Sequence, residues 1–214
     1  MYAKFLKRAI DIVLSFMALI VLSPVFLILI IAGAIAMKGN PFFAQERPGR
    51  INKKTGQERI FKLIKFRTMS NAKDKNGNLL PDDQRLGKYG AILRSTSLDE
   101  LPELFNILVG HLSICGPRPL LVVYLPRYSA EQRRRHEVRP GLTGYAQAYG
   151  RNSLTWEEKF EKDVYYVDHV SFLLDIKILL KTVAVVFKRE GISSETSVTM
   201  EEFMGSEREY AKHE

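Results

Sequence analysis

Two adjacent acids, Asp99 and Glu100, have the residue types and spacing that best suit catalytic chemistry in this sequence. One carboxylate of such a pair can attack phosphorus as a nucleophile, while its neighbour binds Mg²⁺, which prefers hard oxygen ligands. The structural alternative is a helix capping box, because Ser97 and Glu100 have the S-x-x-E spacing. Spacing alone favours the capping box, but Pro102 stands where that helix needs an amide donor. Both alternatives therefore stay open.

Cysteine and histidine do not point to a second kind of site. Cys115 is the single cysteine, which excludes an intrachain disulfide and a cysteine-based metal cluster. We expect it to be a small buried side chain. The four histidines are widely spaced along the chain and match neither a zinc cluster nor a catalytic triad.

Basic residues beside Pro and Gly indicate a pocket for a polyanion. Arg, Pro and Gly recur together at 47–49, 116–119 and 139–141, where Pro fixes the backbone and the guanidinium offers two parallel donors to phosphate. Lys65 and Arg67 alternate along an expected strand, so they share one face. The glycine-rich signatures of P-loop and Rossmann nucleotide sites are absent from the sequence.

No charged residue interrupts the apolar run Ile12–Met37, which exceeds the roughly 20 residues that a membrane-spanning helix needs. Ser23 and Pro24 stand near its middle, where the proline is expected to kink the helix and the serine hydroxyl to bond the freed carbonyl. Both flanks are positive, and positive flanks prefer the cytoplasmic side. A re-entrant hairpin and a spanning helix are about equally supported. Arg8 and Asp11 are three residues apart and are expected to pair at the interface.

The composition is otherwise that of a globular chain, with 214 residues, 46% hydrophobic and 26% charged. It excludes a disordered chain and a disulfide-stapled mini-protein. The formal net charge of +8 suits an anionic membrane face or phosphate-bearing ligands.

Periodicity predicts a mostly α-helical fold with a small β element, of the α+β class. Arg59–Met69 has the alternation of a strand, and residues 71–84 contain turn signals. Helical spacing predicts four helices beyond the apolar run: Leu98–Leu108, Pro126–Val138, Trp156–Val167 and Phe172–Phe187. The last is basic and amphipathic, which fits either a membrane interface or the core of a soluble domain.

Five motifs follow one another along the chain: Lys7-Arg8…Asp11 with Ser23-Pro24, Lys65-Phe66-Arg67-Thr68-Met69, Leu93-Arg94…Leu98-Asp99-Glu100-Leu101-Pro102, Gly116-Pro117-Arg118-Pro119, and Arg139-Pro140-Gly141-Leu142-Thr143-Gly144. In these motifs and their order the chain resembles the bacterial sugar transferases known as monotopic phosphoglycosyl transferases. The resemblance covers about residues 5–191, and the length is similar to that of the small members of the family.

The resemblance implies an activity and a place in the cell. Such enzymes transfer a phospho-sugar from a UDP-sugar to undecaprenyl phosphate and release UMP. They begin glycan assembly on the cytoplasmic face of the inner membrane, ahead of further glycosyltransferases. The string at 150–152 and the tail around 200–203 look most like members that use UDP-N,N′-diacetylbacillosamine. Users of UDP-GlcNAc, UDP-GalNAc or UDP-galactose share the same core motifs.

The resemblance also implies an organisation of the chain. It favours a re-entrant membrane helix at 1–39, bent at Ser23-Pro24. A cytoplasmic catalytic domain with interfacial helices follows at 40–192, and a polar tail at 193–214.

The resemblance assigns roles to the candidate site residues. Asp99 is implied to be the nucleophile that forms a covalent phospho-sugar intermediate, and Glu100 its partner near Mg²⁺, with both acids as metal ligands. Arg94 and Arg118 are implied to contact phosphates. The other candidates for substrate binding are Lys65, Arg67 and Arg139, with Arg151 as the candidate for uridine recognition.

A different class of function competes with this enzyme. A membrane-tethered protein that binds an anionic ligand would also carry a surplus of positive charge, and residues 133–135 are three consecutive arginines. Such a run more often marks a solvated helix face, and no nucleic-acid partner is expected. The sugar transferase accounts for both the apolar run and the acidic pair, whereas a binding protein gives the acidic pair no role, so the enzyme is favoured.

Overall fold

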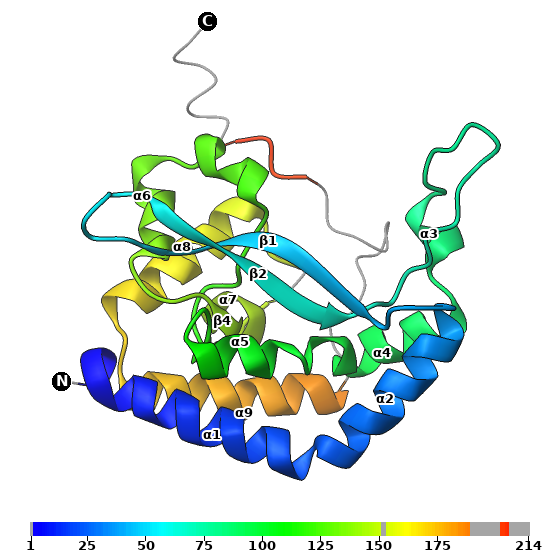
Figure 1. The fold of residues 1–214 in the computed structure, drawn as a ribbon. Helices are drawn as coiled ribbons and strands as arrows, with labels where there is room; N and C mark the ends of the chain where they lie inside the picture. The colour runs from blue at the N-terminus through cyan, green and yellow to red at the C-terminus, as the bar shows by residue number, and fades with distance from the viewer. Residues whose placement is uncertain (1, 151–152, 189–201, 206–214) are drawn as a thin grey trace, which may run out of the picture.

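The apolar run forms two helices that meet at a sharp bend. A computed structural model describes residues 2–150, 153–188 and 202–205 of the chain (Figure 1). After a π-helical turn at Tyr2–Leu6, helix α1 spans Lys7–Val21 and α2 spans Ser23–Ala36, with 65° between them. Pro24 cannot donate to the carbonyl of Ile20, and the Ser23 hydroxyl donates to that oxygen at 2.8 Å instead. The bend predicted at Ser23-Pro24 is therefore confirmed.

In the described residues no helix has, by itself, the length and apolar character needed to cross a membrane. The bent pair α1–α2 reaches that length and character when its two helices are taken together.

The predicted pairing of Arg8 with Asp11 is wrong, because each finds a partner distant in sequence. The Arg8 guanidinium donates to the carbonyls of Ile107 and Leu108, at 2.6 and 2.8 Å. These carbonyls lie in the last turn of helix α5 (Glu103–Val109), where the backbone oxygens lack the helix's regular amide donors and a cation is favoured. Asp11 is buried and accepts hydrogen bonds from the Ser113 hydroxyl, at 2.8 Å, and from the Ile114 amide, at 2.9 Å. These contacts dock α1 on the body of the protein.

Two small sheets carry the strands. Strand β1 (Phe42–Ile51) pairs antiparallel with β2 (Glu58–Phe66), which confirms the strand expected from the alternating pattern. Strands β3 (Ser113–Cys115) and β4 (Gly141–Thr143) pair in parallel. Cys115 is buried in the core, as expected. Helices make up most of the remaining regular structure, so the predicted α+β class is confirmed.

The segment that carries the acidic pair is not one continuous helix. Helix α4 (Lys88–Thr96) ends at Ser97, which has a left-handed backbone with φ of 57°, and Leu98–Glu100 forms a short 3₁₀ turn before α5 begins. The Ser97 side chain makes no capping hydrogen bond, so the capping box is absent. Pro102 lacks the amide that a continuous helix requires, which explains the break.

The basic helix predicted at Pro126–Val138 is also wrong. The chain instead forms a 3₁₀ segment at Val122–Arg127, helix α6 at Ala130–Arg133 and a 3₁₀ turn at Arg134–His136. Ser129 has an extended backbone and accepts a hydrogen bond from the Gln132 amide, so it starts a new helix. Local capping thus overrides the continuous periodicity.

The last two long helices agree with prediction, with α8 at Trp156–Asp168 and α9 at Phe172–Lys188. Shorter helices occupy Asp82–Arg85 (α3), in the loop predicted at 71–84, and Tyr145–Ala148 (α7). Helices α1 and α9 run side by side along the lower edge of the molecule in Figure 1, and Lys7 of α1 is 2.6 Å from Asp175 of α9.

Helices α1, α2 and α9 expose many large apolar side chains. On α1 these include Val13, Phe16, Met17, Ile20 and Val21; on α2, Leu27, Ile28, Ile31 and Ile35; and on α9, Phe172, Leu173, Leu180 and Val183. Exposed apolar side chains this numerous, on helices that lie together, are typical of a surface that contacts a partner or a membrane.

Candidate active site

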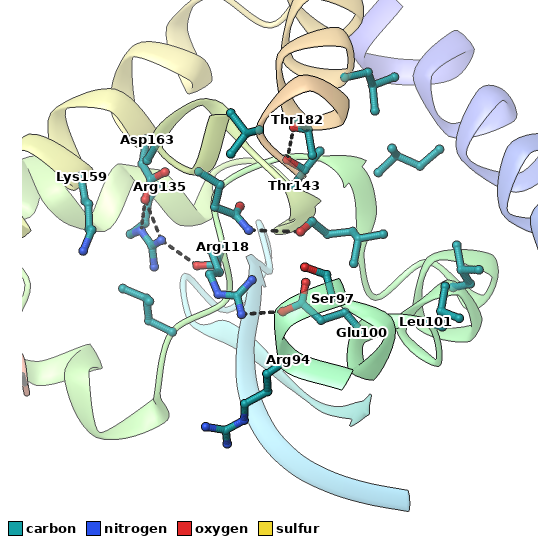
Figure 2. A pocket seen from close by; sticks show the side chains of 18 of the residues that line it. Arg94, Ser97, Glu100, Leu101, Arg118, Arg135, Thr143, Lys159, Asp163 and Thr182 are labelled. Carbon is teal, nitrogen blue, oxygen red and sulfur yellow. Dashed lines mark hydrogen bonds and ion pairs between the residues drawn. The ribbon is translucent and has the colours of Figure 1, made fainter. Parts of the chain in front are cut away.

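A cavity of about 590 Å³ lies between the acidic segment and helices α1 and α9 (Figure 2). One part of its wall is charged and includes Arg94, Glu100 and Arg118. The rest is mainly apolar and draws on several elements, including Ala18 and Leu22 at the bend of α1, Leu104 of α5, Leu142 of β4, and Leu179 and Val185 of α9. The cavity thus combines a charged end with an apolar wall.

Glu100 is held between two cations. Its Oε1 accepts hydrogen bonds from Lys65 Nζ, at 2.8 Å, and from Arg118 Nη2, at 2.7 Å. Burial alone would raise its pKa, but the charges of Arg118 and Lys65 and these hydrogen bonds hold the pKa of Glu100 well below its usual range. Three elements meet here, because Lys65 is the second-to-last residue of β2 and Arg118 follows β3. Glu100 is therefore a fixed carboxylate.

Glu103 is a third carboxyl group beside the same lysine. Its side chain is 3% exposed, and its Oε1 lies 3.1 Å from Lys65 Nζ. Lys65 pairs with that oxygen by charge, and no contact in the described part of the chain has hydrogen-bond geometry to it. Burial raises the pKa of Glu103 to about 7; Lys65 opposes this shift and the Glu100 carboxylate adds to it. Glu103 therefore changes its charge near neutral pH.

The variant Glu103→Gln is expected to change how the free energy of unfolding depends on pH. A carboxyl whose pKa is higher in the folded than in the unfolded chain stabilises the fold at low pH, and this stabilisation is lost as the pH rises. Relative to the variant, the wild-type protein should lose up to ~1 kcal/mol per pH unit between about pH 5 and pH 7, and little more above. Denaturant unfolding in neutral detergent measures this difference. A difference that is constant across this range would contradict the shifted pKa.

Asp99 lies next to this cluster but is not among the residues that line the cavity. In a 3₁₀ turn, side chains three residues apart share a face, so Ser97 and Glu100 line the cavity together and Asp99 is not among its lining residues. Burial and the Glu100 carboxylate raise the pKa of Asp99, against the charges of Lys65, Arg118 and Arg94. Within the described residues its carboxylate makes no hydrogen bond or ion pair. It is thus a carboxylate without a fixed partner beside several cations.

The carboxylates suit Mg²⁺ in kind, but they do not form a complete protein site. In the described part of the chain, no three His, Cys, Asp or Glu side chains converge as metal ligands. Mg²⁺ typically takes one or two carboxylates and completes its shell with water and substrate phosphates. Asp99, without a donor, and Glu103, whose Oε1 has an ion pair with Lys65 but no hydrogen bond that meets geometric criteria, fit such a role. Glu100, predicted as a ligand, already has two cations on its Oε1.

The remaining predicted site residues, Arg94, Arg67, Arg139 and Arg151, do not lie together in the cavity. Arg94 lines the cavity and donates from Nε to the Thr68 hydroxyl at 3.1 Å. Arg67 follows β2, and its side chain lines neither this cavity nor the second pocket. Arg139 lines a second pocket that shares no residue with the first. Arg151 lies outside the described residues. The roles predicted for all of them stay predictions.

A residue of the arginine run that resembles a solvated face is in fact buried. Arg135 is 2% exposed and donates to Asp163 Oδ2 of α8, at 2.7 and 3.0 Å, and to the backbone oxygen of Arg118 at 2.7 Å (Figure 2). It thereby fixes the backbone that carries Arg118. The sequence carries no signal that separates Arg135 from its neighbours, the exposed Arg133 and the half-buried Arg134.

Arg47 is a further cation near the site. It donates to the Pro119 carbonyl at 3.2 Å, and burial together with the charge of Arg118 lowers its pKa to about 10. Its position in an Arg-Pro-Gly string signals this role in the sequence. Arg94, Glu100 and Arg118 thus line the charged end of the cavity, with Lys65 bound to Glu100 and Arg47 bound to the Pro119 carbonyl behind them.

Comparison with known proteins identifies the relatives of this chain. The model of the family described as bacterial sugar transferase matches residues 2–189. An uncharacterized sugar transferase of Bacillus subtilis, EpsL, is 49% identical over 94% of this chain and 96% of its own length.

Two further relatives have names that state a reaction. The UDP-glucose:undecaprenyl-phosphate glucose-1-phosphate transferase of Klebsiella pneumoniae is 38% identical over 83% of this chain. The UDP-N-acetylgalactosamine-undecaprenyl-phosphate N-acetylgalactosaminephosphotransferase of Aeromonas hydrophila is 32% identical over 85% of it. The match spans only 39% and 44% of those two longer proteins.

Proposed function

Because this chain belongs to the bacterial sugar transferase family, we propose that it transfers a phospho-sugar from a UDP-sugar to undecaprenyl phosphate and releases UMP. The observation that carries this proposal is the cavity itself, which joins a cationic end to a long apolar wall. A polyprenyl phosphate has two parts that match these: an anionic phosphate for the cationic end and an apolar chain for the apolar wall. The named reactions of the longer relatives support the same substrates.

The proposed reaction has two displacements at phosphorus. In the first, an Asp99 carboxylate oxygen attacks the phosphorus that bears the sugar, the bond to the UMP phosphate breaks, and UMP leaves. In the second, a phosphate oxygen of undecaprenyl phosphate attacks the same phosphorus, and the bond to Asp99 breaks. Asp99 is then free for another cycle. A covalent intermediate lets a water-soluble donor and a lipid acceptor react in turn at one site.

The charges around the cavity suit this chemistry. An anionic nucleophile meets an anionic pyrophosphate, so fixed positive charge is needed to stabilise the transition state. Arg118 and Lys65 supply it, and Glu100 and Arg135 hold Arg118 in place. Bound Mg²⁺, held by Asp99 and a neighbouring acid together with substrate phosphates, would neutralise further charge on the pyrophosphate.

We further propose that the bent pair α1–α2 enters the cytoplasmic face of the inner membrane and returns to it. The exposed apolar side chains of α1, α2 and α9 support this placement, and so do the positive flanks of the apolar run. Ala18 and Leu22 line the cavity near the bend, so a lipid chain among these helices has a short path to Arg118. The enzyme would begin a membrane glycan that further glycosyltransferases extend.

The identity of the sugar in the donor is the most specific part of the proposal. We propose a UDP-N-acetyl amino sugar, with UDP-N,N′-diacetylbacillosamine as the first candidate and UDP-galactose or UDP-glucose as alternatives. The named relatives use glucose and N-acetylgalactosamine, so both classes belong in the test.

A panel of these UDP-sugars, assayed with undecaprenyl phosphate in detergent, is expected to release UMP with one donor at least ~100-fold faster than with the others. Discrimination of this size is expected when a buried polar group of the enzyme pairs with the acetamido group. Release of UMP from neutral hexose donors alone would contradict an amino-sugar donor. No release from any donor would contradict the proposed reaction.

A further inference from the structure

A second pocket, of about 440 Å³, lies near the turn of the β1–β2 hairpin. Its wall contains three arginines: Arg50 of β1, Arg59 of β2 and Arg139 before β4. The ring of His111 stacks on Phe61 beside them, with 5.4 Å between ring centroids. The reaction proposed above, with Asp99 as nucleophile, gives none of these residues a role.

A β-bulge brings two of these arginines together. The pairing Pro48↔Ile60 shifts to Ile51↔Glu58, so the two residues between Pro48 and Ile51 oppose Arg59 alone. One of the two is Arg50. Like charges opposite one another across a strand pair destabilise the pairing. The fold therefore places Arg50 against Arg59 at a cost in stability.

The three guanidinium groups have no protein partner. Within the described residues none of them makes a hydrogen bond or an ion pair. By contrast, Arg133 pairs with Glu58 at 2.6 Å, and Arg134 pairs with Glu131 at 2.7 Å. Burial and the nearby charges of Arg50, Arg8 and Arg59 lower the pKa of Arg139. Asp11 offsets part of this effect on Arg139, but none of the three arginines has a carboxylate in ion-pair contact within the described residues.

The pocket also borders exposed apolar surface. Ile60 lines it and is 44% exposed, and Val109, beside the lining residue Gly110, is 65% exposed. A Cβ at position 110 would lie 3.2 Å from the Arg8 guanidinium, so the glycine leaves room for that side chain at the start of α1. An anion that binds here would have apolar side chains next to its charged group.

We propose that Arg50, Arg59 and Arg139 form a second phosphate-binding site, separate from the cavity at Glu100. The phosphate belongs either to the headgroup of an anionic membrane lipid or to a soluble phosphate compound. Three guanidinium groups offer the parallel donors that phosphate oxygens accept. The ligand replaces the missing partners and removes the repulsion among the arginines.

The test compares two double variants of equal charge change. Arg50→Gln/Arg59→Gln removes two cations from the pocket, whereas Lys53→Gln/Lys54→Gln removes two exposed cations from the hairpin turn, outside it. Thermal unfolding of the full chain is measured in neutral detergent, with inorganic phosphate or with chloride at equal ionic strength. Phosphate bound at Arg118 affects all the proteins equally and cancels in the comparison.

Phosphate is expected to raise the unfolding midpoint of the wild-type protein and of the lysine variant. In the arginine variant, the apparent affinity should fall by about tenfold or more, because two charge-assisted contacts are lost. Without phosphate, the arginine variant should unfold at a higher temperature than the wild type, because the repulsion is gone. An equal phosphate effect in the two double variants would overturn the proposal.

A second arm identifies the source of the phosphate. Mixed micelles that contain phosphatidylglycerol are compared with phosphatidylcholine micelles and with soluble glycerol phosphate. Stabilisation by phosphatidylglycerol well beyond that by glycerol phosphate, lost in the arginine variant, supports the lipid headgroup. Equal stabilisation by both, again lost in that variant, supports a soluble phosphate compound. Stabilisation by neither would overturn the site.

Discussion

The variant Asp99→Asn is expected to lose UMP release by roughly 10⁴-fold or more, as is typical when a covalent nucleophile is removed. The amide has the shape of the carboxylate but cannot attack phosphorus. The fold should survive, because within the described residues the Asp99 carboxylate makes no hydrogen bond that the variant would break. The rate is measured with the best donor of the panel and undecaprenyl phosphate.

Asp83→Asn provides the matched control, since Asp83 is exposed on α3 and undergoes the same chemical change. It should retain the wild-type rate. Rapid-quench mass spectrometry of the wild-type protein, given donor without acceptor, should find a phospho-sugar on Asp99. A full rate in Asp99→Asn, or an adduct on another residue, would contradict the nucleophile assignment.

Single cysteines placed before and after the apolar run are expected to react with a membrane-impermeant thiol reagent from one side only, the cytoplasmic one. Ala3→Cys and Lys53→Cys suit the test, because both positions are exposed and flank the bent pair α1–α2. A chain that bends at Leu22 and returns leaves both ends on the face that it entered. Labelling is compared between inverted membrane vesicles, which expose the cytoplasmic side, and intact spheroplasts, which expose the opposite side. Both cysteines should be labelled fully in the first preparation and not at all in the second.

The native cysteine does not disturb this experiment, because Cys115 is 1% exposed. A Cys115→Ser background and detergent-opened vesicles serve as controls for labelling and for access. Labelling of residues 3 and 53 from opposite sides would establish a spanning helix and contradict the re-entrant arrangement. The reaction proposed at Asp99 would stand in either case.

Several features follow from the sequence because they depend on neighbouring residues alone. Proline lacks an amide hydrogen wherever it occurs, so the bend at Ser23-Pro24 and the break at Pro102 can be anticipated locally. The alternation before Phe66 likewise identifies β2. The order of the motifs identifies the family, which the comparisons establish.

The basic segment at 126–138 shows where such local inference fails. Periodicity alone allows one helix, but the cap at Ser129 ends one turn and starts another. Burial is equally invisible in a run of like residues. Arg135 enters the core because Asp163 and the Arg118 carbonyl lie across from it, whereas Arg133 and Arg134 stay at the surface.

The sequence by itself determined the bend, the family and the acidic pair, because each rests on covalent chemistry or on short strings of residues. Only the tertiary structure decided the partners of those residues. In the folded chain Arg8 binds the end of α5, and Asp11 binds β3. Burial raises the pKa of Glu103. Arg118 and Arg139 line two different pockets. Electrostatic partners and burial depend on segments that lie far apart in the chain, and folding alone brings those segments together.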